Sequence, residues 1–378
     1  MFAVALCGAM AGAQDLPRGE IVDDVKCLDA PAEGYALYLP SNYAPGRPLP
    51  MLMGFHPGAR GRAIVEKYRA AAEKYGYIVA ASNNSRNGAW EVSAKAIQAM
   101  STDLSRRFAI DINRVYLTGL SGGARVAMQV ALAGNKIAGV IASSAGYPDA
   151  RPRSSVPFVV FGTAGTDDFN YIEMRQLDAA LKTPHHVVIF QGGHTLPPDD
   201  VAMAAIEWLE LQAMSSGKRT KDEPLIDRLL TGRQQAIAAA GESAEAVHLL
   251  RALASDFKGL RDVSAPAARA AQLAKQKDIS RALSRERDDD AAEARLLEQV
   301  VSLEAGLADD ARRMDCLGDL RDLLSRLSTQ ASAAADSAQR GRARRVLRIV
   351  TMGASERVHD AAYLKLLQQI TVPRSARL

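Results

Sequence analysis

The sequence predicts an α/β fold with a mostly parallel central sheet, followed by an all-helical C-terminal region. Three observations lead to this prediction. Short apolar runs alternate with helical patterns up to about Ser215, and most of these runs are continuously apolar. Strands covered by helices on both faces have that pattern. After Ser215 the sequence is rich in Ala, Leu, Arg and acidic residues and shows no strand pattern. The strand–helix alternation predicts right-handed crossovers, with the ligand site at the carboxyl ends of the strands.

The expected elements follow from apolar periodicity and from turn residues between the periodic segments. The strands are predicted at Tyr35–Leu39, Pro50–Phe55, Tyr77–Ser82, Arg114–Thr118, Ile137–Ser143, Pro157–Gly162 and His185–Phe190. The helices between them are predicted at Ala63–Tyr75, Trp90–Phe108, Gly122–Ala133, Tyr171–Leu181 and Asp199–Met214.

The C-terminal region shows leucines at helical spacing, which predicts amphipathic helices. We expect a catalytic domain over residues 14–214, a linker over 215–224 and a separable helical domain over 225–378. Self-association through these helices is one expectation, and an internal leucine core is the alternative. If the helices form a solvated bundle without a partner, the basic run of this region is expected to lie on its surface. The leucine stripes are Leu317, Leu320, Leu324 and Leu327, and Leu249, Leu250, Leu253 and Phe257. The basic run is Arg340, Arg342, Arg344 and Arg345. Breaks between helices are predicted at Gly241, Asp288–Asp290 and Arg340–Gly341.

Composition narrows the class of protein. The chain has 378 residues, 48% of them hydrophobic and 24% charged, which are ordinary values for a soluble globular protein. A net charge of +4 is too small to predict a nucleic-acid partner. No apolar run approaches the roughly 18 residues that span a bilayer. Cys27 and Cys316 fall in different predicted domains, so free thiols are expected rather than a disulfide framework.

The first 13 residues resemble the apolar core of a secretory signal peptide. They end at Ala11-Gly12-Ala13, a small-x-small cleavage pattern that precedes Gln14. A buried first strand is the alternative interpretation. The signal-peptide interpretation predicts a secreted or periplasmic protein.

The strongest motif is Gly119-Leu120-Ser121-Gly122-Gly123, which follows a predicted strand and opens a predicted helix. This is the context of a nucleophile elbow, in which a strained turn presents the serine at a helix N-terminus. Bulky residues in place of Gly119 or Gly123 would collide with the turn. We therefore predict Ser121 as a catalytic nucleophile, against the alternative of a surface serine on a glycine-rich turn.

A serine nucleophile needs a base and an acid that orients it. His194, in Gly192-Gly193-His194, follows the last predicted strand and is the predicted base. Asp168 follows the strand before it and is the preferred acid, with Asp167 as the alternative and Asp149 as a weaker substitute. The order Ser–Asp–His along the chain is the one found in α/β-hydrolases.

The oxyanion hole should combine the Gly122 N–H with one from the loop after Phe55. Pro57 has no N–H, so Gly58 or Ala59 must be the second donor, and His56 is expected to have a structural role. The loop that ends at Trp90 is best placed to line the pocket. Trp90 is predicted either to bind substrate by stacking or to pack structurally.

These motifs resemble one group of esterases. From about Tyr35 to Met214 the chain is similar to the polyhydroxybutyrate depolymerases and feruloyl esterases of the α/β-hydrolase superfamily. The resemblance rests on His56-Pro57-Gly58, Gly119–Gly123, Gly162-Thr163-Ala164 with Asp168, and Gly192-Gly193-His194 followed by Pro197-Pro198. It implies an α/β-hydrolase fold and serine-dependent hydrolysis of carboxylic esters.

The expected partner is therefore a small-molecule or polymeric ester, with no nucleic acid and no membrane span. No spacing predicts a metal site and no motif predicts a cofactor. Two alternatives remain: a serine peptidase of the same fold, and an inactive hydrolase-like domain that serves a helical interaction scaffold.

Overall fold

The protein divides into two compact units. The computed structural model describes residues 16–134, 136–335, 337–352 and 358–370. The first unit comprises residues up to 163, 177–188 and 196–226, and we call it the sheet unit. The second comprises 164–176, 189–195 and the residues from 227 onward, and we call it the helical unit. The boundary therefore crosses the ends of two strands instead of following a single linker.

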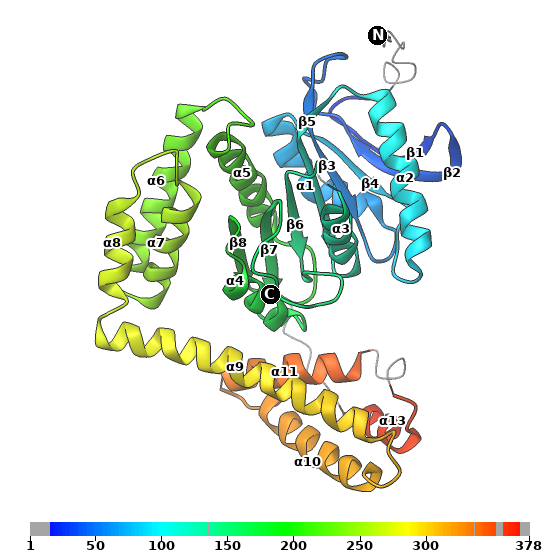
Figure 1. Ribbon diagram of the computed structural model, residues 1–378, viewed down its shortest axis with the longest axis vertical. Helices are drawn as coiled ribbons and strands as arrows, with labels where there is room; N and C mark the ends of the chain where they lie inside the picture. The colour runs from blue at the N-terminus through cyan, green and yellow to red at the C-terminus, as the bar shows by residue number, and fades with distance from the viewer. Residues whose placement is uncertain (1–15, 135, 336, 353–357, 371–378) are drawn as a thin grey trace. The chain divides into compact units, whose positions relative to one another are not determined.

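The elements alternate as the sequence predicts (Figure 1). In the alternating part they are β1 Ile21–Cys27, β2 Ala30–Tyr38, β3 Leu49–Phe55, α1 Gly61–Tyr75, β4 Ile78–Ser82, α2 Trp90–Arg107, β5 Ile110–Leu120, α3 Gly122–Ala133, β6 Gly139–Ser143, β7 Val159–Gly165, α4 Tyr171–Ala180, β8 His185–Phe190 and α5 Asp199–Ser215. The helices that follow are α6 Glu223–Ala240, α7 Ala244–Asp256, α8 Ser264–Leu273, α9 Lys277–Gly306, α10 Arg313–Ala331, α11 Ala338–Thr351 and α13 Ala361–Gln368.

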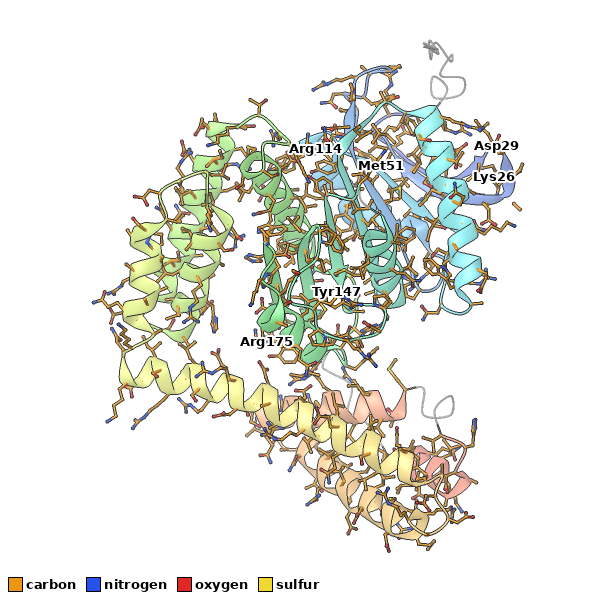
Figure 2. The ribbon with its side chains drawn as sticks, in the orientation of Figure 1. Lys26, Asp29, Met51, Arg114, Tyr147 and Arg175 are labelled. Carbon is orange, nitrogen blue, oxygen red and sulfur yellow. The ribbon has the colours of Figure 1, made fainter. Side chains whose placement is uncertain are left out.

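The described strands form one sheet in the order β1-β2-β4-β3-β5-β6-β7-β8. The strands β4, β3, β5, β6 and β7 pair in parallel, whereas β1 and β2 run antiparallel to their neighbours. Every residue of β3 is buried, including Met51 in the middle of the sheet (Figure 2). This confirms the predicted α/β-hydrolase fold with a mostly parallel sheet and a helical C-terminal region.

The first strand, Ile21–Cys27, was not predicted. It lies at the edge of the sheet and pairs with β2 from Ile21 opposite Tyr38 to Cys27 opposite Ala30. Only Val25 and Cys27 are buried on it, and two aspartates interrupt its apolar pattern. The pairing partner, not the periodicity of the segment, makes it a strand.

Two helices cover one face of the sheet. Tyr68 of α1 and Trp208 of α5 lie in one hydrophobic core with strand residues such as Leu52 and Phe161. Helices α2 and α3 contribute nothing to that core and pack on the opposite face (Figure 1). The continuous apolar strands are therefore buried on both sides, as their sequence indicated.

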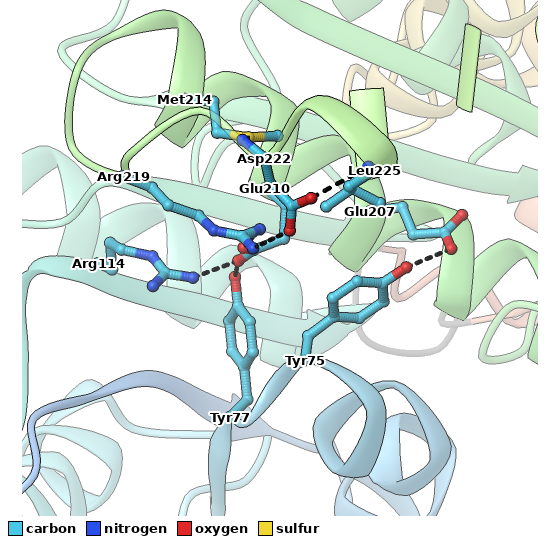
Figure 3. A network of polar contacts seen from close by, with 9 residues as sticks. All are labelled: Tyr75, Tyr77, Arg114, Glu207, Glu210, Met214, Arg219, Asp222 and Leu225. Atoms are coloured by element: carbon cyan, nitrogen blue, oxygen red, sulfur yellow. Dashed lines mark hydrogen bonds and ion pairs between the residues drawn. The ribbon is translucent and has the colours of Figure 1, made fainter. Parts of the chain in front are cut away.

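A buried carboxylate fastens α5 to the sheet and to the chain beyond α5. Glu210 is 1% exposed and accepts hydrogen bonds from Tyr77, Arg114 and Arg219 (Figure 3). Arg219 lies beyond the end of α5 and also binds Asp222 at 2.9 Å. A buried charge is tolerable when it is paired and hydrogen-bonded, as Glu210 is here.

The helical unit has two small cores along α9. Residues of α7 and α8 pack with Ile279 and Leu283 at its start. The leucines of α10 pack with α11, α13 and the C-terminal half of α9. Those leucines include the predicted stripe of α10, which is buried in the described unit, so the stripe forms internal core. Self-association stays a prediction.

Two predicted helix breaks were wrong, while Gly241 does separate α6 from α7. Asp288–Asp290 lies inside α9, and Arg340–Gly341 lies inside α11. Asp and Gly are poor helix formers, but ion pairs compensate in the aspartate run. Asp289 pairs with Arg342 at 3.1 Å, and Asp290 pairs with Arg175 at 3.1 Å. The basic run of α11 is thus not simply a solvated face.

Three further expectations concern the ends and the cysteines. The signal-peptide-like segment 1–13 lies outside the described residues. None of the helices described is long and apolar enough to cross a membrane. Cys27 and Cys316 are free and buried, and burial raises the pKa of Cys27 to about 11, so that thiol is protonated and inert at neutral pH.

Candidate functional site

Ser121 occupies the turn between β5 and α3 in a strained conformation. Its backbone has φ 55° and ψ −123°, a region that residues with a side chain rarely adopt. The turn is held by hydrogen bonds, since the Ser121 N–H donates to Ser143 O at 2.8 Å and the Ser121 C=O accepts from Ala124 N at 2.9 Å. Strain that the surrounding structure maintains is typical of functional positions.

The two glycines that flank the turn lie against backbone. A Cβ on Gly119 would come within 2.3 Å of the Gly123 carbonyl carbon and oxygen. A Cβ on Gly123 would come within 2.2 Å of Phe55 O and 2.6 Å of Phe55 C, on the neighbouring strand β3. No side-chain rotation can relieve such contacts, so the turn requires glycine at both positions, as the elbow motif predicts.

The loop after β3 contains the two candidate oxyanion donors. The Gly58 N–H lies 3.0 Å from His56 Nδ1, and the Ala59 N–H donates to His56 O at 3.0 Å. Arg60 Nη2 lies 3.0 Å from the other ring nitrogen, His56 Nε2. Ala59 also has a positive φ of 54°, so this loop is strained as well.

His56 can accept only one of these two hydrogen bonds. Burial, with the charge of Arg60, lowers the pKa of His56 to about 4, so the imidazole is neutral at pH 7. A neutral imidazole has one acceptor nitrogen. The Gly58 N–H donates to Nδ1 and the Ala59 N–H donates to His56 O, so both candidate donors are hydrogen-bonded within this loop.

A second loop of the sheet unit lies over the oxyanion region. Asn87 N donates to Pro57 O at 2.9 Å, and an isolated bridge joins Gly58 to Arg86. The Asn87 side-chain amide approaches Gly122 so closely that a Cβ there would lie 1.9 Å from Oδ1. Trp90, three residues further on, begins α2 and is 38% exposed.

Asp168 and His194 are hydrogen-bonded in the helical unit. His194 Nδ1 lies 2.8 Å from Asp168 Oδ1, which also accepts from the Asn170 N–H at 2.8 Å. Asp168 is fully buried, while the His194 side chain is 20% exposed. A buried carboxylate on Nδ1 orients the imidazole and leaves Nε2 to act as a base.

The loops that carry this pair are joined through their backbones. Thr166 N donates to Phe190 O at 2.8 Å, and Asp167 N donates to Gly192 O at 2.8 Å. Gly165 approaches Gly192 so closely that a Cβ would lie 2.4 Å from the Gly192 carbonyl oxygen. We call residues 165–170 the acid loop and residues 191–194 the histidine loop.

Phe169 also orients the histidine. Its ring stacks on the His194 ring, with the centroids 3.9 Å apart and the planes inclined by 23°. An aromatic face attracts a cation, so this contact favours the imidazolium that forms when a base takes a proton.

The other two aspartates have different surroundings. Asp167 interacts with the histidine loop through its backbone N–H. Asp149, in the sheet unit, pairs with Arg153 at 2.9 Å, and hydrogen bonds from Arg153 lower the pKa of that exposed carboxyl. Of the three predicted acids, Asp168 is the one that the structure places on His194.

The predicted site residues therefore fall into two groups. Ser121, Gly122, Gly58, Ala59 and Trp90 belong to the sheet unit, and Asp168, Asp167 and His194 belong to the helical unit. Within the described residues, no group of three or more His, Cys, Asp and Glu side chains could hold a metal ion. Sequence reasoning missed Asn87 and Phe169, although both stand in loops that it had singled out.

The sequence matches no protein-family model and no curated protein. Among solved structures, it is similar to a thermostable esterase, with 18% identity and a TM-score of 0.37 over 50% of this chain and 61% of that one. It is also similar to the fluorophosphonate-binding serine hydrolase F of Staphylococcus aureus, with 16% identity and a TM-score of 0.41 over 51% of this chain and 99% of the other. Esterase B of Lactobacillus rhamnosis is 12% identical, with a TM-score of 0.43 over 53% of this chain and 87% of the esterase.

Proposed function

We propose that this chain, with its α/β-hydrolase fold, is a serine-dependent carboxylic ester hydrolase that uses Ser121, His194 and Asp168. The observation that carries the proposal is the 2.8 Å hydrogen bond between the buried Asp168 and His194, in a chain whose Ser121 stands on a strained strand–helix turn. An isolated glycine-rich turn or an ordinary surface histidine would explain only one of these features.

The order of the strands supports the assignment. Ser121 follows β5, the acid loop follows β7, and the histidine loop follows β8. Strands β5, β6 and β7 are parallel neighbours, with β8 next to β7 in the sheet. Ligand sites of such sheets lie at the carboxyl ends of the strands, which is where all three residues occur in the chain.

The proposed reaction is acyl transfer through a covalent intermediate. His194 Nε2 takes the proton of the Ser121 hydroxyl while Oγ attacks the ester carbonyl carbon. The N–H of Gly122, with that of Gly58 or Ala59, stabilises the oxyanion of the tetrahedral intermediate. His194 then protonates the leaving alcohol as the C–O bond breaks, and water hydrolyses the acyl-enzyme by the same steps in reverse.

The test is labelling of the full chain by a fluorophosphonate probe together with hydrolysis of aryl esters. We expect wild type to label at Ser121 and Ser121→Ala not to label. His194→Ala should lose about 10⁴-fold or more in kcat, and the double variant should lose little more. Absence of labelling, or losses that multiply in the double variant, would contradict the proposal. Turnover of peptide anilides in place of esters would favour the peptidase alternative.

The substrate is proposed to be a small or polymeric ester met outside the cytoplasm. Residues 1–13 motivate this localisation through their cleavage pattern before Gln14. Expression in a Gram-negative host, followed by mass spectrometry of the mature N-terminus, tests it. A product that keeps residues 1–13 in the cytoplasmic fraction would contradict secretion, and would leave the hydrolase proposal standing.

A further inference from the structure

Helix α11 binds the acid loop through two arginines. Arg345 Nη1 donates to Thr166 O at 2.7 Å, and Arg348 Nη1 donates to Asp167 O at 2.7 Å. Thr166 and Asp167 are the two residues that precede Asp168. All of these residues belong to the helical unit.

Arg345 is itself held on three sides. Its Nε donates to Glu293 Oε1 at 2.8 Å, and its Nη2 donates to the second oxygen of the same carboxylate. The guanidinium also lies over the Tyr171 ring, 4.1 Å from the centroid, just beyond the acid loop. Glu293 is 1% exposed. A bidentate pair with a buried carboxylate fixes the plane of the guanidinium, so the remaining N–H is aimed at Thr166 O with little freedom.

Arg348 borders both catalytic loops. Its Nη1 donates to Asp167 O. The same Nη1 lies 3.9 Å from the position that a Cβ on Gly193 would occupy. Asp167 in turn donates its N–H to the histidine loop at Gly192 O. One arginine therefore contacts the backbone of the loop before Asp168 and lies against the loop before His194.

We propose that α11 holds the acid loop in the position from which Asp168 orients His194, and that Arg345 and Arg348 are positioning residues for ester hydrolysis. The proposal rests on the proposed function. Hydrogen bonds from a charged donor to a carbonyl are stronger than neutral ones, and a misplacement of about 1 Å at a catalytic group costs about 100-fold in rate. The C-terminal helices thereby become part of the hydrolase, although the sequence favoured a separable domain.

The proposal makes a direct prediction about truncation. A chain cut after Met214 would lack α11 and with it both donors to the acid loop. Where the sequence indicated a separable helical domain, this proposal predicts that residues 14–214 alone do not hydrolyse small esters.

The experiment uses the full chain and four variants: Arg348→Ala, Arg348→Lys, Asp168→Asn and the double variant of Arg348→Ala with Asp168→Asn. Arg348→Ala should lower kcat on a small aryl ester by about 10-fold or more with KM changed less than about twofold, because Asp168 acts on chemistry, not on binding. Arg348→Lys should recover part of the loss, since it restores one charged donor. In the Asp168→Asn background, Arg348→Ala should cost less than about twofold, because the two changes disable the same group.

Arg342→Ala is the matched control. Arg342 lies on the same helix and pairs with Asp289 of α9 at 3.1 Å instead of with the acid loop. We expect its kcat to equal that of wild type. Equal losses for Arg342→Ala and Arg348→Ala would show a general effect on the fold and would overturn the proposal, as would losses of Arg348→Ala and Asp168→Asn that multiply.

A spectroscopic readout separates this proposal from the proposed function. The proton of His194 Nδ1, bonded to Asp168, should give a low-field NMR resonance in wild type and in Arg342→Ala. It should weaken or move in Arg348→Ala whether or not the enzyme turns over. A resonance that is unchanged in Arg348→Ala overturns only the proposed positioning role of α11. A wild type that shows the resonance but neither labels nor hydrolyses esters overturns the proposed function alone.

Discussion

The replacement Gly119→Ala tests whether backbone packing at the elbow positions the nucleophile. The new Cβ would lie 2.3 Å from Gly123 C and O and 2.6 Å from Ala124 N. An ordinary contact is about 3.4 Å or more, so strand β5 and helix α3 must move apart by about 1 Å. Overpacking costs about 1–3 kcal/mol, and we expect about 3 kcal/mol here, because the obstructing atoms are backbone.

This destabilisation should be visible in urea unfolding followed by tryptophan fluorescence. The chain has two tryptophans, Trp90 and Trp208, and both belong to the sheet unit. With a slope of about 3 kcal/mol per molar urea, a loss of about 3 kcal/mol lowers the midpoint by about 1 M. A shift of about 1 Å at the turn should also slow fluorophosphonate labelling of Ser121 by about 100-fold.

Gly134→Ala is the matched control in the same unit. Gly134 ends α3 with φ −115°, and a Cβ there would meet Val130 O at 3.4 Å, an ordinary contact. We expect a midpoint close to that of wild type and normal labelling. If Gly119→Ala behaves like Gly134→Ala in both measurements, the backbone contact at the elbow does not position Ser121 and the reasoning is refuted.

Three further predictions concern charge. Asp168→Asn should fold normally and lose most of its kcat, because the His194 imidazole loses its orienting charge. Asp167→Asn should keep a kcat within about threefold of wild type, because the backbone of Asp167, not its side chain, contacts the histidine loop. A larger loss of kcat in Asp167→Asn would reverse the assignment of the acid. Burial lowers the pKa of His56 to about 4, below its unfolded value near 6.5. The contribution of neutral His56 to the free energy of unfolding is therefore fully present above pH 6.5 and is lost as the pH falls from 6.5 to 4. At pH 5 the loss in the free energy of unfolding is on the order of 2 kcal/mol. The pH dependence of the urea midpoint should flatten in His56→Gln, and a profile identical to that of wild type would contradict this. Glu210→Gln should destabilise the sheet unit by about 3 kcal/mol or more, because Arg114 keeps a buried charge without its partner; an unchanged midpoint by tryptophan fluorescence would show that the network contributes little.

Much of the fold could be predicted because its determinants are local. The apolar runs of β3 to β8 and the helices between them follow from periodicity, and the turn at Ser121 requires glycines that the sequence displays. Gly241 likewise ends α6 with φ 61°, which is a local property of glycine. The chain order of Ser121, Asp168 and His194 could be predicted because each residue lies in a local sequence motif.

What the sequence missed depends on partners that are distant along the chain. Ile21–Cys27 is a strand because β2 pairs with it, and Asp288–Asp290 continues a helix because arginines more than fifty residues away neutralise it. Local propensity is weak compared with such tertiary contacts, so these errors are of one kind.

The same distinction applies to the candidate site. The sequence by itself determined that a serine elbow, an acid loop and a histidine loop follow β5, β7 and β8. Only the tertiary structure decided which of two adjacent aspartates reaches His194, because neighbouring residues on a turn point in different directions. It also decided that Arg345, the last residue of the basic run, and Arg348 bind carbonyls of the acid loop that lie about 180 residues away along the chain. Such a contact has no sequence pattern, because nothing local to either segment requires the other.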